Sequence, residues 1–155
     1  MQPVESIKTA YDLIRNHYGE SLYSDDIPDL VLFSDEADTV SGEYDDANEE
    51  ISLNMYYCTT AEQCVKTLIH EYMHYLQPRN WYQRYYKMGH THQTHPYEIQ
   101  AEQVAERDWQ RFTQPFYTFE WLTTRHNWDH PDSLNEIGEL VDIEVTVNGT
   151  PVGQL

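Results

Sequence analysis

The pattern His-Glu-x-x-His occupies residues 70–74, and it constrains the fold and chemistry of this chain more than any other feature. On a helix, residues four positions apart lie one above the other, so His70 and His74 can reach one metal ion while Glu71 points to the same open face. Zinc suits two neutral imidazole ligands, keeps an open coordination position and lowers the pKa of bound water to ~7. The pattern therefore predicts a zinc-bound water as nucleophile, with Glu71 as the base that takes its proton.

The residues around this pattern predict a helix of about four to five turns. Two capping boxes are possible at its start, Thr59 with Glu62 or Thr60 with Gln63, and Pro78 ends the helix. Apolar residues at helical spacing predict its buried faces: Val65, Leu68, Ile69, Tyr72, Met73 and Leu76. The alternative to a metal site is a pair of solvated or core histidines on an ordinary helix.

A third metal ligand is expected from residues 95–105. Pro96 fits the first turn of a helix, which places a stripe of carboxylates and alanines on one face: Glu98, Ala101, Glu102 and Ala105. The small alanines allow a close approach to the histidine helix, so that Glu98 reaches the metal ion. Glu102, one turn further on, can accept the second ring N–H of a ligand histidine and fix its tautomer. The alternative is a solvated acidic helix face.

With these residues the chain resembles the gluzincin metallopeptidases, and among them the short minigluzincins and the related ImmA/IrrE-type domains. The matching motifs are His70-Glu71-x-x-His74 and Glu98-x-x-Ala101-Glu102, with a separation that falls in the usual gluzincin range. Two expected strands before the helix match as well, and the resemblance covers about residues 3–113. It implies one zinc ion per chain held by His70, His74 and Glu98, with Glu71 as general base and Glu102 as an acid that supports a ligand.

The segment 79–95 between the two helices is expected to be a loop rich in tyrosine, tryptophan and histidine. One of its histidines, His90, His92 or His95, is the alternative third ligand, and the chain would then resemble the SprT-like zinc proteases. We favour Glu98 because a flexible run of histidines loses more conformational entropy on ordering than a carboxylate on a helix. A Tyr or His of this loop could donate to the oxyanion of a tetrahedral intermediate, or the aromatic rings could simply pack. The sequence does not identify that donor or the substrate-binding residues.

The acidity of the chain limits its partners. The formal net charge is -18 and the pI is near 4.5, which disfavours duplex nucleic acid and anionic membranes because both would be repelled. We therefore expect a peptide or protein substrate, with cationic partners favoured. The first residues lack the basic and apolar regions of a signal peptide, and no stretch approaches membrane-spanning length, so a cytoplasmic location is expected. The oligomeric state is not constrained.

The two cysteines do not predict a disulfide framework. Cys58 and Cys64 are too few and too close together in the sequence for one, and no C-x-x-C spacing supports a metal site. We expect reduced, half-buried thiols.

The remaining pattern predicts an α+β, zincin-like fold with a small twisted sheet. Apolar residues at helical spacing predict an N-terminal helix that ends at Gly19 and covers the sheet. Short apolar or alternating runs predict three strands, at residues 30–33, 40–44 and 51–55, with a turn at 45–48 between the last two. The active helix is expected to pack against this sheet.

The chain is expected to form a metallopeptidase domain at residues 1–113 and an extension at 114–155 that packs on the same domain. The extension carries aromatic residues expected to pack on the domain: Phe116, Phe119 and Trp121. A helix is expected at 133–141, and the Asn-Gly pair predicts a hairpin within 144–152.

These patterns predict a zinc metallopeptidase that hydrolyses peptide bonds without a covalent intermediate. In this interpretation Glu71 takes a proton from water and then delivers it to the leaving amine. A second hypothesis, from another functional class, is a catalytically weak regulatory or protein-binding module that keeps the zinc site.

Overall fold

The computed structural model describes residues 3–118, 121 and 142–143, so the helix expected at 133–141, the hairpin expected at 144–152 and Phe119 lie outside the described residues. The elements follow in the order α1 (Pro3–Tyr18), β1 (Asp29–Phe33), β2 (Gly42–Asp45), β3 (Glu50–Asn54), α2 (Ala61–Leu76), α3 (Arg79–Lys87), α4 (Pro96–Asp108), the 3₁₀ turns η1 (Trp109–Phe112) and η2 (Gln114–Phe116), and β4 (Asp142–Ile143). Within these described ranges, the helices are too short or too polar to cross a membrane.

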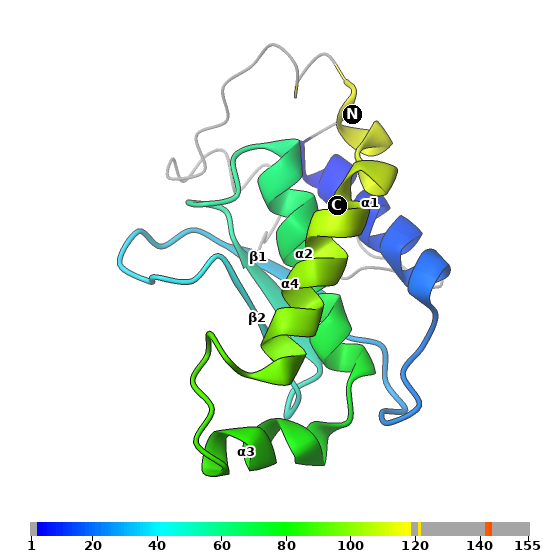
Figure 1. Ribbon diagram of the computed structural model, residues 1–155. Helices are drawn as coiled ribbons and strands as arrows, with labels where there is room; N and C mark the ends of the chain where they lie inside the picture. Colours follow the sequence, from blue (N-terminus) through cyan, green and yellow to red (C-terminus); the bar gives the residue numbers. More distant parts are fainter. Residues whose placement is uncertain (1–2, 119–120, 122–141, 144–155) are drawn as a thin grey trace.

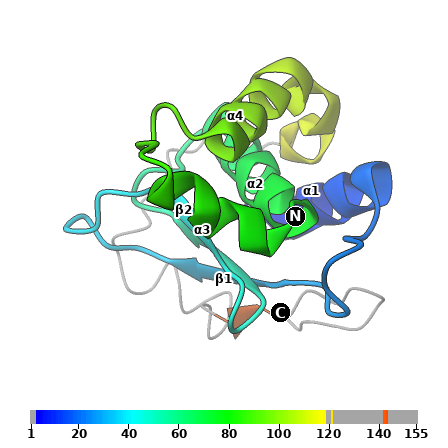
Figure 2. The same cartoon turned by 60° about the horizontal axis from the view of Figure 1, so that its bottom comes forward.

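The sheet is mixed, with the strand order β2-β3-β1-β4. Strands β1 and β3 run parallel, while β2 pairs with β3 and β4 with β1 in antiparallel fashion. The register places two pairs of buried side chains on one face, Leu30 beside Ile51 and Leu32 beside Leu53. Helices α1 and α2 lie on the same face of this sheet (Figure 2). The α+β class and the small sheet are therefore confirmed, and the structure shows that the sheet is mixed.

The turn between β2 and β3 is shifted by one residue from the expected position, to residues 46–49. Asp45 belongs to β2, and its carboxylate accepts the backbone N–H groups of Ala47 and Asn48 at 3.0 and 3.2 Å. A side chain that caps the turn in this way lets the strand continue through Asp45 itself. The strands β2 and β3 accordingly begin and end within two residues of the predicted limits.

Helix α1 covers the sheet through apolar residues that are fully buried: Val4, Ile7, Tyr11 and Ile14. The helix ends at Tyr18, and Gly19 follows with a φ of 84° while its N–H donates to the carbonyl of Arg15 at 2.8 Å. A positive φ at this position is cheapest for glycine. The predicted helix end is therefore confirmed.

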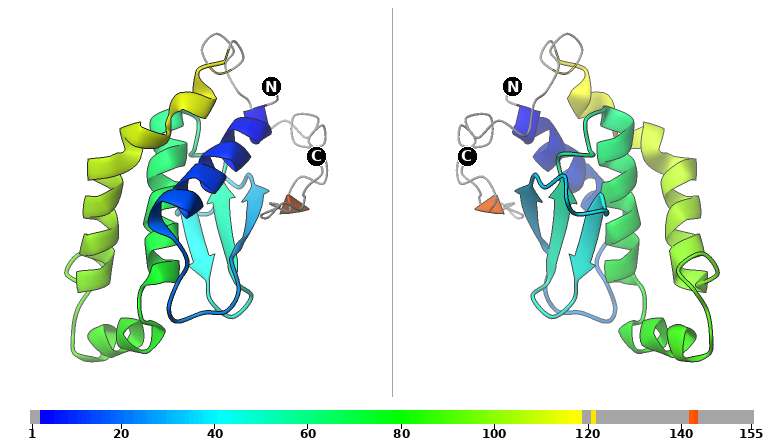
Figure 3. Two further views of the ribbon diagram at one scale, coloured as in Figure 1. Left: turned by 90° about the vertical axis from the view of Figure 1, so that its right-hand side faces the viewer. Right: turned by 90° about the vertical axis from the view of Figure 1, so that its left-hand side faces the viewer.

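Helix α2 lies between the sheet and α4 (Figure 3). Of the two possible capping boxes, the structure forms the one between Thr60 and Gln63, in which each side chain bonds the backbone N–H of the other. Glu62 instead pairs with Lys66 at 2.6 Å. The apolar side of the helix is buried as predicted, with Val65, Leu68, Ile69 and Tyr72 fully enclosed.

Helix α4 lies alongside α2 (Figure 1). Ala101 and Ala105 are buried on the side of α4 that faces α2, as the spacing of the small residues predicted. Their short side chains allow the two backbones to approach closely. This packing brings the first turn of α4, which carries Glu98, to the C-terminal half of α2.

The segment 79–95 was expected to be a loop, and this expectation was wrong for its first half. Residues 79–87 form α3, at the C-terminal end of α2 (Figure 1). Aromatic rings four positions apart pack on each other along this helix, Trp81 on Tyr85 and Tyr82 on Tyr86. Gly89, with a φ of 103°, follows the helix end. The aromatic residues therefore form a helix surface rather than a flexible run.

The chain beyond α4 continues to pack on the same core. Phe116 of η2 is buried among residues of the core, and η2 contacts α1. The Trp121 ring lies edge-on to Phe116 at a centroid distance of 4.8 Å. Both residues thus pack as expected for the start of the extension.

Both cysteines are free thiols, as expected, but they are completely buried rather than half-buried. The Cys64 thiol donates to the carbonyl of Cys58 at 3.4 Å, in the turn that enters α2. Burial raises the pKa of Cys64 well above its ordinary value, so this thiol is inert and serves in packing.

Candidate metal centre

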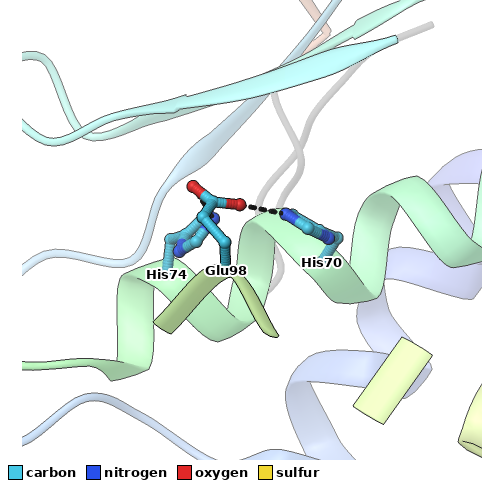
Figure 4. A group of neighbouring side chains, drawn as sticks. All are labelled: His70, His74 and Glu98. Atoms are coloured by element: carbon cyan, nitrogen blue, oxygen red, sulfur yellow. Dashed lines mark hydrogen bonds and ion pairs between the residues drawn. The ribbon is translucent and has the colours of Figure 1, made fainter. Parts of the chain in front are cut away.

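Three side chains from two helices point toward one another beside the C-terminal half of α2 (Figure 4). The Nε2 atom of His70 lies 2.9 Å from one oxygen of Glu98, and the Nε2 atom of His74 lies 3.2 Å from the other. One possible donor atom from each residue falls within 4.8 Å of the other two, so that among the described residues these three could hold a metal ion. The structure therefore brings together the three ligands expected from the sequence.

The geometry of α2 and α4 explains this convergence. His70 and His74 share a helix face one turn apart, with ring centroids 4.9 Å apart. Glu98 lies in the first turn of α4, where Pro96 begins the helix and the His95 side chain caps it. Both histidines present Nε2 to the carboxylate, which leaves each Nδ1 facing away from the proposed metal position.

The buried carboxylate of Glu98 is only 5% exposed and is held in its charged form. Burial alone would raise the pKa of Glu98, but hydrogen bonds from His70, His74 and the Tyr82 hydroxyl lower it well below its usual range. The Tyr82 hydroxyl donates to the Oε2 atom of Glu98. One anionic oxygen and two imidazole nitrogens are donor atoms that suit a divalent cation such as zinc.

Glu71 lies beside this group and is 9% exposed. Burial raises the pKa of its carboxyl above the ordinary value, although the neighbouring His74 and His70 act in the opposite direction. Strand β2 passes close to Glu71. A Cβ atom on Gly42 of this strand would lie 2.4 Å from Thr67 Cγ2 and 3.5 Å from Glu71 Cγ. A side chain at position 42 would collide with Thr67 and push β2 away from α2, which explains the glycine there.

An open cleft of about 840 Å³ contains these groups. Its walls include residues 39–44 leading into and along β2, one face of α2, the start of α3, His92 of the following loop, and the face of α4 that carries Glu98 and Glu102. Sites for small ligands and peptides are commonly of this size. His70, His74, Glu98 and Glu71 are therefore accessible from the cleft.

The three loop histidines differ in their reach to this centre. His95 is buried as the cap of α4, where its Nδ1 accepts the N–H of Tyr97 and its Nε2 contacts the Tyr82 carbonyl. His90 contacts the Thr94 hydroxyl instead. His92 lies 3.6 Å from Glu98 Oε1, and it alone of the three lines the cleft. The alternative of a third histidine ligand is thereby reduced to His92.

Two residues that contact the centre were not identified from the sequence. In the sequence Tyr82 is one of several equivalent aromatic residues. In the structure α3 brings its hydroxyl to Glu98. Gln77 accepts a hydrogen bond from His74 Nδ1 at 2.8 Å. Its position three residues after His74 was a usable signal, because residues at that spacing can meet at a helix end.

Glu102 lies where the sequence placed it, with Oε1 3.4 Å from His70 Nδ1 and a side chain that is 63% exposed. We expect Glu102→Ala to weaken zinc binding by about 10-fold, the lower end of the range for residues that orient a ligand. Glu106→Ala is the control, since Glu106 pairs with Lys66 at 2.9 Å instead. Competition with a chromophoric chelator measures both affinities, and equal, negligible changes would remove Glu102 from the site.

Comparisons of the chain with models of known families, with curated proteins and with solved structures found no match.

Proposed function

We propose that this protein is a zinc-dependent metallopeptidase of the zincin-like type. The observation that carries the proposal is the convergence of two imidazole nitrogens and one carboxylate beside a buried glutamate in an open cleft. Peptide hydrolysis by metal-activated water needs this combination of ligands, base and access.

The three residues fit zinc by the nature of their donor atoms. Two neutral imidazoles and one carboxylate are a common ligand set of catalytic zinc sites, which keep a further position open for water or substrate. Zinc bound by His70, His74 and Glu98 would supply Lewis-acid chemistry, lowering the pKa of water and polarising a carbonyl oxygen.

Glu71 carries the proton transfers in this proposal. Its carboxylate takes a proton from the attacking water and returns it to the amine of the departing peptide. Burial beneath β2 raises its pKa toward the range in which a carboxylate is an effective base. No side chain forms a covalent bond to the substrate.

The edge strand β2 supports a peptide as the substrate. It ends the strand order, and residues 40–44 line the cleft beside α2. An edge strand carries backbone N–H and C=O groups that an extended peptide can pair with. Tyr82 lines the same cleft, and its hydroxyl donates its one proton to Glu98, so it orients this carboxylate.

The test is hydrolysis of casein and of a pool of quenched fluorescent peptides by the purified protein. Cleavage that a chelator abolishes and added zinc restores supports the proposal. Tight binding of one zinc ion without turnover of any peptide would instead support the regulatory or protein-binding module.

A further inference from the structure

We propose that Gln77 is a positioning residue that fixes the ring of His74 for metal binding and joins it to the helix that carries Glu98. This inference rests on the metal centre of the proposed function, and it does not require that the centre hydrolyse peptides. No motif assigns a role to Gln77, whose side chain is 6% exposed and lines the cleft.

The backbone places the Gln77 side chain beside the ligand. Helix α2 ends at Leu76, and Gln77 takes an extended conformation with φ of −85° and ψ of 152°. The following Pro78 favours that conformation because its ring disfavours a helical residue before it. The N–H of Gln77 donates to the His74 carbonyl at 3.3 Å, which closes the last turn. The side chain is thereby directed back toward His74 and across to α4.

The hydrogen bonds of the Gln77 amide determine its orientation. One end of the amide lies 3.0 Å from the carbonyl oxygen of Tyr97, which can only accept, so this end is the NH₂ group. The same NH₂ group donates to Gln100 Oε1 at 2.8 Å. The other end, 2.8 Å from His74 Nδ1, is therefore the carbonyl oxygen, which can only accept.

This orientation requires a proton on Nδ1 of His74. With that nitrogen protonated, the atom available to a metal ion is Nε2, and Nε2 is the atom that faces Glu98 at 3.2 Å. The carbonyl of Tyr97 thus determines the direction of the amide, and the amide determines which nitrogen of His74 can bind the metal.

The same contacts join the two helices of the centre. Tyr97 directly precedes Glu98, so one side chain is bonded both to a histidine ligand on α2 and to the turn of α4 that presents the carboxylate. His70 lacks such a bridge, since its Nδ1 faces the exposed Glu102. Gln77 therefore supports the more buried half of the ligand set.

Two substitutions separate the role of Gln77 as hydrogen-bond acceptor for His74 from its role as a bridge to Tyr97 of α4. Gln77→Ala removes both, and we expect zinc affinity to fall ~10 to 100-fold. Gln77→Glu keeps an acceptor for His74 but has no N–H for Tyr97, so we expect zinc affinity at or above that of the unmodified protein, with a lower Tm of the metal-free chain. Gln83→Ala is the control, because Gln83 is an exposed residue of α3 that lines the same cleft.

The measurements are zinc affinity by chelator competition, Tm without metal, and ¹H–¹⁵N NMR of the zinc-loaded protein. The Nδ1–H signal of His74 should be protected from exchange in the unmodified protein and in Gln77→Glu, and should exchange with water in Gln77→Ala. Equal loss of zinc affinity in both Gln77 variants would mean that Gln77 only bridges the two helices, and this would overturn the proposal. Unchanged zinc affinity in Gln77→Ala would overturn it as well. Since no peptide is involved, an inactive protein would refute the proposed function and leave this result standing.

Discussion

Glu71→Gln is expected to lower peptide turnover by ~10² to 10⁴-fold, the contribution typical of a positioned general base. The substitution keeps the size of the side chain and leaves the proposed zinc ligands His70, His74 and Glu98 unchanged. Zinc should stay bound in a stoichiometry of one per chain, and the fold should persist, because an amide is easier to bury than a carboxylate. The measurement is kcat on a cleaved peptide together with zinc content.

Glu43→Gln is the matched control for this prediction. Glu43 belongs to β2, lines the same cleft and is exposed, so its neutralisation changes the charge of the cleft without removing the proposed base. We expect its kcat to stay within a few-fold of the unmodified protein. If Glu71→Gln loses its metal while the remaining zinc-loaded fraction turns over normally, Glu71 is structural.

The sequence predicted the elements that depend on local spacing. Helix α2 is recognisable because a capping box, an apolar stripe and Pro78 agree on its limits, and the end of α1 because Gly19 accepts a positive φ. The approach of α4 to α2 followed from the small residues Ala101 and Ala105. These features are set within a few residues of each other, so they can be read before the fold is known.

Features that depend on tertiary contacts could not be predicted in the same way. Helix α3 was missed because its stripe consists of tyrosine and tryptophan, which fit an aromatic loop equally well. The choice of Tyr82 among its neighbours requires the position of Glu98, which is set by a different helix. The need for a glycine at position 42 likewise depends on how α2 packs on the sheet, because this packing brings β2 close to Glu71. The residues of the centre and Glu102 were thus visible in the sequence, while Tyr82 and Gln77, which contact Glu98 and His74, were not.

The second large effect concerns the third ligand. Glu98→Ala is expected to weaken zinc binding by far more than Glu102→Ala, because it removes a charged donor and leaves two half-buried imidazoles without their carboxylate. Chelator competition should show a weaker site held by two histidines, and hydrolysis should fall with zinc occupancy. The metal-free chain should lose little secondary structure, since α4 stays anchored to α2 through Ala101 and Ala105.

His92→Ala tests the competing ligand set in the same assay. His92 is 66% exposed and lies 3.6 Å from Glu98 Oε1, so it contacts the carboxylate and is the one histidine of the loop able to take its place. With Glu98 as the ligand, removal of His92 should leave zinc affinity within about two-fold, as for an ordinary surface change. The inverse result, in which His92→Ala loses zinc and Glu98→Ala keeps it, would assign three histidines to the metal and the protein to the SprT-like chemistry. A carboxylate on a helix that already contacts both histidines loses less conformational entropy on binding a metal than an exposed loop side chain does. This difference favours Glu98 as the ligand.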